Sequence, residues 1–132
     1  MKKVKMIQQK IVGKPLGKAK GLFGFHILSR FEGCDPSFLD NKELLLKILY
    51  KAADYADMTP IGDLSKNFQP QGATVVLGLE ESHISIHTWP EHGVAVIDVY
   101  TCGNEESCEK AHEKLIEKIP HKKITNFSKT ER

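Results

Sequence analysis

The chain has 132 residues, of which 40% are hydrophobic and 27% charged, with a formal net charge of +2. These values are ordinary for one globular domain, and no apolar run of about 18 residues is present to form a membrane span. The N-terminus has lysines but no apolar signal core, which argues against secretion. An odd number of cysteines without a C-x-x-C pair argues against a disulfide framework, so we expect a reducing cytoplasm.

Charge is distributed unevenly along the chain. Residues 1–20 carry seven lysines and no acidic residue, which leaves a formal charge of −5 on the remainder. Gly13, Pro15 and Gly17 interrupt this stretch, so we interpret it as a basic leader with little regular structure. Contact with nucleic acid is the alternative, but no basic stripe with interleaved aromatic residues follows it, and we expect no nucleic-acid partner. Residues 21–132 are expected to form a single domain.

The first expected elements are a strand and a helix. Residues 21–33 alternate aromatic or branched side chains with other residues, which predicts a strand ending in the turn Gly33-Cys34-Asp35-Pro36. A helix is expected to begin at Asp40, with Glu43 completing a capping box, and to end before Thr59-Pro60. Its apolar stripe consists of Leu45, Ile48, Leu49, Ala52 and Ala56.

Strand patterns dominate the middle of the chain. Residues 64–72 are expected to form a loop or an edge segment, and residues 73–79 a short apolar strand. The chain is expected to stay extended through residues 84–90. Residues 94–102 are apolar on both faces, which predicts a central strand.

A second helix and a final strand complete the expected fold. The helix is expected from Glu105 to Ile119, with Asn104 as its N-cap, and a polar edge strand is expected over residues 122–127. Because the strands between residues 73 and 102 are joined by links of hairpin length, antiparallel pairing is favoured. The predicted fold class is therefore α+β, an antiparallel sheet covered by two helices on one face.

The stretch from Glu80 to Glu91 carries side chains suited to chemistry, including two imidazoles, an indole and three carboxylates. Ser82 and His87 are five residues apart and would face opposite sides of a straight strand, which argues against a simple Ser–His dyad. His83 and His87 would share a face about 13 Å apart, so a metal site is a remote alternative. Its ligands would be His83, His87, His92 and Cys102.

The three cysteines differ in position. Cys102 ends a core strand, where it is either a small buried residue or, with an imidazole nearby, a general acid or nucleophile. Cys108 lies on the apolar stripe of the second helix, and we interpret it and Cys34 as packing residues.

Four segments of the chain resemble the motifs of the prokaryotic-type S-adenosylmethionine decarboxylases. The resemblance covers roughly residues 22–128 and leaves the lysine leader outside. The segments are Glu81-Ser82-His83-Ile84-Ser85-Ile86-His87-Thr88-Trp89-Pro90-Glu91, Asp98-Val99-Tyr100-Thr101-Cys102-Gly103, Gly33-Cys34-Asp35-Pro36 and Phe68-Gln69-Pro70-Gln71-Gly72.

This resemblance implies a proenzyme that cuts itself between Glu81 and Ser82. The Ser82 hydroxyl would attack the preceding carbonyl to give an ester, and β-elimination followed by hydrolysis would convert residue 82 into a pyruvoyl group. The products would be a β chain, residues 1–81, and an α chain, residues 82–132. The pyruvoyl carbonyl would form a Schiff base with the substrate amine and serve as the electron sink for decarboxylation.

The resemblance also assigns roles to individual residues. His87 would be the proton acceptor in processing, assisted by the Thr74 hydroxyl, and Cys102 the catalytic proton donor. Phe68 would stack on the adenine of S-adenosylmethionine and Glu91 would bind its ribose hydroxyls. Ile84 and Trp89 are further candidates for the substrate site, although core packing is the favoured interpretation of Trp89. No metal is implied, and the expected assembly is a homodimer of αβ units or a higher homo-oligomer.

Two alternative functions are also compatible with the sequence. Lys66 and His92 stand where the family usually has a histidine and an aromatic residue, which leaves arginine or ornithine as alternative substrates for the same mechanism. An unprocessed, non-enzymatic regulatory relative is the second alternative, and it predicts an uncut chain. The leading expectation is decarboxylation of S-adenosylmethionine to the aminopropyl donor for spermidine and other polyamines.

Overall fold

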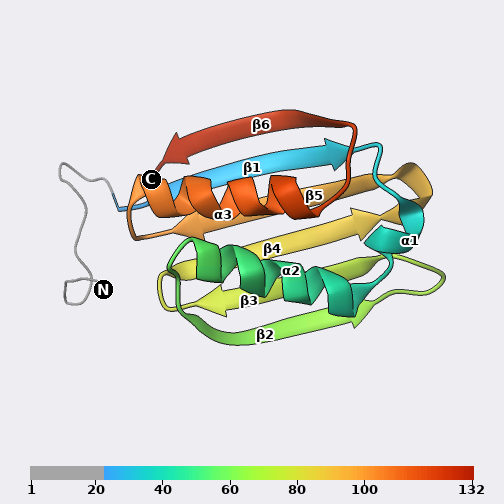
Figure 1. Ribbon diagram of the computed structural model, residues 1–132, viewed down its shortest axis with the longest axis horizontal. Helices are drawn as coiled ribbons and strands as arrows, with labels where there is room; N and C mark the ends of the chain where they lie inside the picture. Colours follow the sequence, from blue (N-terminus) through green and yellow to red (C-terminus); the bar gives the residue numbers. More distant parts are fainter. Residues whose placement is uncertain (1–22) are drawn as a thin grey trace.

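The computed structural model describes residues 23–132, so the expected basic leader lies outside the described residues. Six strands form one sheet in the order β2-β3-β4-β5-β1-β6, and every neighbouring pair is antiparallel (Figure 1). The strands are β1 (Phe25–Glu32), β2 (Pro60–Asn67), β3 (Ala73–Leu79), β4 (Ser82–Trp89), β5 (Val94–Thr101) and β6 (Lys123–Glu131).

Two long helices, α2 (Lys42–Tyr55) and α3 (Glu105–Lys118), lie side by side on one face of this sheet (Figure 1). Helix α2 packs over β2 and β3, whereas α3 packs over β1 and β5. The predicted α+β class, with helices on one face of an antiparallel sheet, is confirmed. No helix within residues 23–132 combines the length and the apolar character that crossing a membrane requires.

The core lies between the helices and the sheet, because alternate strand residues face the helices. In β3 and β5 the buried positions alternate strictly with half-buried ones. Strand β5 lies between β4 and β1, which confirms its predicted central place. Each of the apolar stripe residues predicted for α2 is buried. We refer to the opposite side of the sheet, which neither α2 nor α3 covers, as the open face.

The start of α2 differs from the prediction. A short helix, α1 (Pro36–Leu39), precedes it, and the Asp35 side chain caps α1 by accepting from Ser37 N. Asn41 rather than Asp40 caps α2, accepting from Leu44 N at 3.1 Å. The Asp40 carboxylate instead accepts from Gly72 N at 2.8 Å, so it ties the β2–β3 loop to the helix and is not free to cap.

The sheet edges also refine the prediction. Residues 64–67 do form an edge strand, but β2 already begins at Pro60, where a helix stop alone was expected. Proline is compatible with this position because it is the first residue of an edge strand. The final strand β6 occupies the other edge, as predicted, and extends further, to Glu131.

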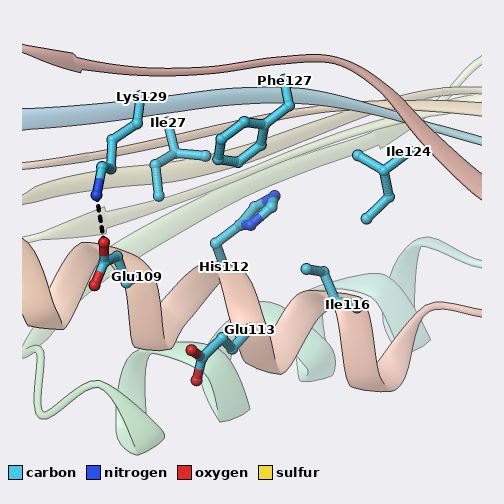
Figure 2. A pocket seen from close by; sticks show the side chains of 8 residues that line it. All are labelled: Ile27, Glu109, His112, Glu113, Ile116, Ile124, Phe127 and Lys129. Carbon is cyan, nitrogen blue, oxygen red and sulfur yellow. Dashed lines mark hydrogen bonds and ion pairs between the residues drawn. The ribbon is translucent and has the colours of Figure 1, made fainter.

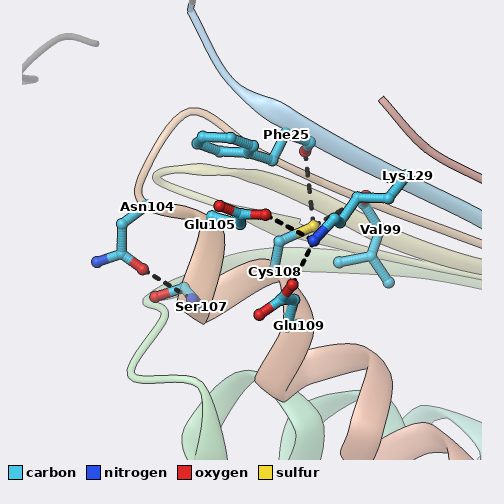
Figure 3. A network of polar contacts seen from close by, with 8 residues as sticks. All are labelled: Phe25, Val99, Asn104, Glu105, Ser107, Cys108, Glu109 and Lys129. Carbon is cyan, nitrogen blue, oxygen red and sulfur yellow. Dashed lines mark hydrogen bonds and ion pairs between the residues drawn. The ribbon is translucent and has the colours of Figure 1, made fainter. Parts of the chain in front are cut away.

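Helix α3 and strands β1 and β6 line a shallow hollow of about 440 Å³ (Figure 2). The His112 side chain projects from α3 toward this hollow, and its Nε2 lies 2.8 Å from the Ser29 hydroxyl of β1. At the start of α3, the Lys129 ammonium of β6 contacts the carboxylates of Glu105 and Glu109 (Figure 3). The Lys129 contacts hold β6 against α3, whereas the His112 contact joins α3 to β1.

Candidate active site

The turn between β3 and β4, residues 80 and 81, is tied to two other segments of the chain. Glu80 N donates to Thr59 O at 2.9 Å, and Thr59 N donates to a Glu81 carboxylate oxygen at 3.1 Å. On the other side, Cys102 N donates to the Glu81 carbonyl oxygen at 2.9 Å. The Glu81–Ser82 peptide bond is therefore held between the segment after α2 and the segment after β5.

Ser82 is the first residue of β4 and is paired in register with Thr101 of β5. Among residues 23–132, no hydrogen bond joins Ser82 to His87, in agreement with the expectation that they face opposite sides of a strand. Five steps of about 3.3 Å place the two residues roughly 16 Å apart along β4. A Ser–His dyad within this strand is excluded.

His87 instead pairs with Thr74 across the β3–β4 ladder. The two residues are Cα partners, and Thr74 Oγ1 lies 3.0 Å from His87 Nδ1. Both side chains lie on the open face, since their strand neighbours Val75 and Ile86 are buried against the helices. The structure thus brings together the two residues for which a joint processing role was expected.

The cysteines divide as their positions suggested. Cys34 and Cys108 are buried, and burial raises the pKa of their thiols to about 11 and about 12 respectively. They are packing residues, and the Cys108 thiol also points at the carbonyl oxygens of Phe25 and Val99 (Figure 3). Cys102 is only partly buried and follows the end of β5, which distinguishes it from the other two cysteines.

The residues expected to bind substrate lie toward the far end of β4 from Ser82. Glu91 is exposed in a short 3-10 helix, η1 (Pro90–His92), that follows β4 directly. Phe68 is 44% exposed in the β2–β3 loop, with the Lys66 ammonium 5.9 Å from the centre of its ring. Trp89 is 43% exposed, which contradicts the reading of it as a core residue.

Ile84 differs from the other substrate-site candidates. Its side chain is fully buried on the helix side of β4. Any influence on a substrate therefore acts through its packing or its backbone, and its place in the site stays a prediction. The four residues of the alternative metal site do not converge: within residues 23–132, no three His, Cys, Asp or Glu side chains form a group that would hold a metal ion.

The structure also contains a polar cluster next to Ser82 that the sequence analysis did not predict. Asp98 of β5 accepts a hydrogen bond from His26 Nε2 of β1, and its Oδ1 lies 3.8 Å from His83 Nε2 of β4. One feature of the sequence could have indicated this cluster, because Asp98 is the one charged residue in the otherwise largely apolar β5. Which residues it meets depends on strand order, because β1 is far away in sequence.

The fold and this arrangement define an α+β protein with a tethered Glu-Ser peptide bond at one end of its sheet. A family model described as S-adenosylmethionine decarboxylase matches residues 25–132. That range covers most of the chain, and the chain belongs to the S-adenosylmethionine decarboxylase family.

Individual relatives agree with this assignment. Proteins named S-adenosylmethionine decarboxylase proenzyme from Sulfurihydrogenibium sp. and Aquifex aeolicus are 48% and 46% identical to it over 101 residues. Those residues are 76% of this chain in both cases, and 76% and 75% of the respective relatives. The crystal structure of the adenosylmethionine decarboxylase from Aquifex aeolicus is 42% identical and superposes with a TM-score of 0.79, covering 84% of this chain and 91% of that one.

Proposed function

We propose that this chain is a self-processing, pyruvoyl-dependent enzyme that decarboxylates S-adenosylmethionine to the aminopropyl donor used in polyamine synthesis. Family membership over residues 25–132 supports the reaction. The mechanism is supported chiefly by the surroundings of the Glu81–Ser82 peptide bond. Its carbonyl oxygen accepts a hydrogen bond from Cys102 N, and further hydrogen bonds join the same turn to Thr59. These hydrogen bonds hold the peptide bond in place, and the one from Cys102 N favours charge on the Glu81 carbonyl oxygen.

The chain's own residues fit the formation of a pyruvoyl group at position 82. Attack of Ser82 Oγ on the Glu81 carbonyl carbon forms a C–O bond, breaks the C–N bond and transfers the hydroxyl proton to the new amine. The Cys102 amide donates to the oxygen on which negative charge develops. A base then removes the Ser82 Cα proton, the Cβ–Oγ bond breaks, and Glu81 leaves as a carboxylate. Addition of water and loss of ammonia complete residue 82.

The pyruvoyl group would supply the electron sink that decarboxylation of an α-amino acid needs and that no ordinary side chain offers. Cys102 lies next to position 82 through its backbone contact with Glu81, and its thiol is partly exposed. It is the residue of this chain suited to return a proton to the substrate after carbon dioxide leaves.

The separation along β4 supports a homodimer of αβ units. His87 and Thr74 lie roughly 16 Å from Ser82 in one protomer, and Glu91 lies further still. A second copy that packs its open face against the first in the opposite direction would bring its His87 end over the Ser82 end of the first, and Ser82, as the first residue of β4, would have to turn toward that face. The open face presents large apolar side chains for this, including exposed Leu28 and Leu64, and packed sheets are the usual way to bury such a face.

Substrate and compartment are the finer parts of the proposal. An exposed carboxylate at Glu91 and an exposed aromatic ring at Phe68 suit a ribose and an adenine, whereas arginine and ornithine carry neither group. We retain S-adenosylmethionine as the substrate for that reason. All three cysteines are free thiols, which suits a reducing cytoplasm.

Intact-mass measurement of the purified protein tests the proposal. We expect two chains separated at Glu81–Ser82, with an α chain whose terminus lacks an amine, and release of carbon dioxide from S-adenosylmethionine but not from arginine or ornithine. Ser82→Ala should leave one uncut chain, whereas Ser85→Ala, a matched control on the same strand, should still be cut. Cys102→Ala should be cut and turn over slowly. A wild-type chain that stays uncut would contradict the proposal and favour the non-enzymatic alternative.

A further inference from the structure

Five side chains at the Ser82 end of the sheet form one connected group, which we call the Asp98 cluster. Its members come from three adjacent strands and from the residue after β6: His26, His83, Asp98, Tyr100 and Arg132. His26, Tyr100 and His83 occupy one row across β1, β5 and β4, and Asp98 lies in the next row on the same face.

Hydrogen bonding within the cluster determines which atoms carry protons. Arg132 Nη1 lies 3.1 Å from His26 Nδ1, and because a guanidinium only donates, His26 Nδ1 accepts. His26 Nε2 must then carry the proton that it donates to Asp98. The hydrogen bond from His26 thus holds the Asp98 carboxylate in place. The same carboxylate oxygen, Oδ1, lies 3.8 Å from His83 Nε2.

Tyr100 fixes the geometry of the cluster from within. Its ring centre lies 5.4 Å from that of His26 and 6.1 Å from that of His83, with the Arg132 guanidinium 5.8 Å away. The ring can lie there because position 24 is glycine: a Cβ at Gly24 would come within 2.6 Å of the Tyr100 hydroxyl oxygen. The two imidazoles are therefore held at set places on either side of one ring.

Self-cleavage, which belongs to the proposed function above, creates a problem that this cluster solves. Cutting the Glu81–Ser82 bond removes the covalent link between β3 and β4 and turns residue 82 into a chain end. On the Ser82 side, the β3–β4 ladder ends at His83, which pairs with Gly78, so Ser82 itself has no partner in β3. His83 is thus the first residue after the cut that is paired on both sides, and its side chain is the first that can anchor the new end.

We propose that Asp98 is a positioning residue, which holds His83 through the carboxylate–imidazole contact of 3.8 Å and thereby sets the place of residue 82 during processing and turnover. A reacting group misplaced by about 1 Å can lose a hundredfold in rate, so loss of such an anchor has measurable consequences. The two consequences fall on different steps. Elimination at Ser82 needs an aligned Cα–H bond, and a misaligned ester persists until water cleaves it to a carboxylate and a serine amine.

The test compares Asp98→Asn with Glu32→Gln in the full-length chain. Glu32 is a matched control, because it also faces the open side, has a similarly exposed carboxylate (25% against 32%) and contacts Arg30 at 3.0 Å, but lies at the other end of β1. We expect Asp98→Asn to raise the share of α chains that begin with serine, measured by intact mass. In the pyruvoyl-bearing fraction, kcat should fall about tenfold with KM changed less than twofold. Glu32→Gln should match the wild type in both readouts.

A second variant identifies His83 as the residue through which Asp98 acts. His83→Gln should reproduce both defects, and Asp98→Asn combined with His83→Gln should be no worse than the more severe single variant. An unchanged serine share and kcat in Asp98→Asn would overturn the inference, as would fully additive defects in the double variant. A wild-type chain that is never cut would instead overturn the proposed function.

Discussion

Several polar residues of this protein lie where burial or pairing changes their chemistry, and His112 is the clearest example. It is 4% exposed, its Nε2 meets the Ser29 hydroxyl, and the rings of Phe31 and Phe127 pack beside it. Burial lowers the pKa of its imidazole to about 4. Glu109, Glu113 and Lys129 line the same hollow but do not reverse this shift. His112 is therefore a neutral structural residue rather than a second catalytic histidine.

The pKa of His112 predicts a loss of stability in mild acid. Because the folded-state pKa is below the unfolded value of about 6.5, only the unfolded state takes up a proton as the pH falls from 6.5 to 4. Between pH 7.5 and pH 5 this should cost about 2 kcal/mol of unfolding free energy. Urea unfolding of the uncut Ser82→Ala protein measures it, and adding His112→Asn should remove that part of the decline. An equal decline in both proteins would contradict the assignment.

At the scale of elements, the N-terminal caps of the two long helices stabilise the fold, and one of them lies close to the Glu81–Ser82 bond. Asn41 caps α2 and Asn104 caps α3, accepting from Leu44 N and from Ser107 N at 2.7 Å (Figure 3). Asn104 follows Cys102 by two residues, so the first turn of α3 also determines where the amide that contacts the Glu81 carbonyl lies. Asn41 has no such link to the Glu81–Ser82 bond.

The two caps therefore make a matched pair for mutation. Asn104→Ala and Asn41→Ala should each lower the free energy of unfolding by about 1 kcal/mol in the uncut Ser82→Ala background. In the cleavable protein, only Asn104→Ala should slow cutting at Glu81–Ser82, followed as the fraction of uncut chain over time. Asn104→Asp, which keeps the capping oxygen, should restore the rate. Equal slowing by both alanine variants would show that the effect is general destabilisation.

Over the whole molecule, the proposed cut divides a sheet whose strands are interleaved. Strands β1, β2 and β3 would belong to the β chain, and β4, β5 and β6 to the α chain. Because the sheet order is β2-β3-β4-β5-β1-β6, β1 lies between two strands of the other chain. The cut therefore leaves one folded unit, with chain boundaries at three strand pairs.

Completion of the site by a second protomer predicts complementation between inactive variants. Ser82→Ala lacks the hydroxyl and His87→Ala lacks the proposed processing base, so neither should be cut when produced alone. In a mixed dimer, His87 of the first variant should reach Ser82 of the second, and co-expression should yield cut chains bearing the His87→Ala substitution. The absence of cut chains in mixed dimers, verified by two affinity tags, would show that His87 acts within its own protomer.

The sequence by itself determined the class of this fold and led to the peptide bond that we propose is cut. Strand and helix periodicities predicted the antiparallel sheet, the helix layer and the central place of β5, because these follow from side chains within one element and from short links. Ser82 was singled out in another way, by the resemblance of the segment from Glu81 to Glu91 to a known family, because spacing alone argued against a Ser82–His87 dyad. Where a residue had alternative partners, as Asp40 did between a helix cap and Gly72, local pattern predicted the wrong one.

Only the tertiary structure decided which residues meet. The contact between the Cys102 amide and the Glu81 carbonyl requires that β4 and β5 pair in one particular register. The Asp98 cluster requires β1 beside β5, although their residues are some seventy positions apart. Strand order and register arise from packing the whole core at once, and no short stretch of sequence contains them.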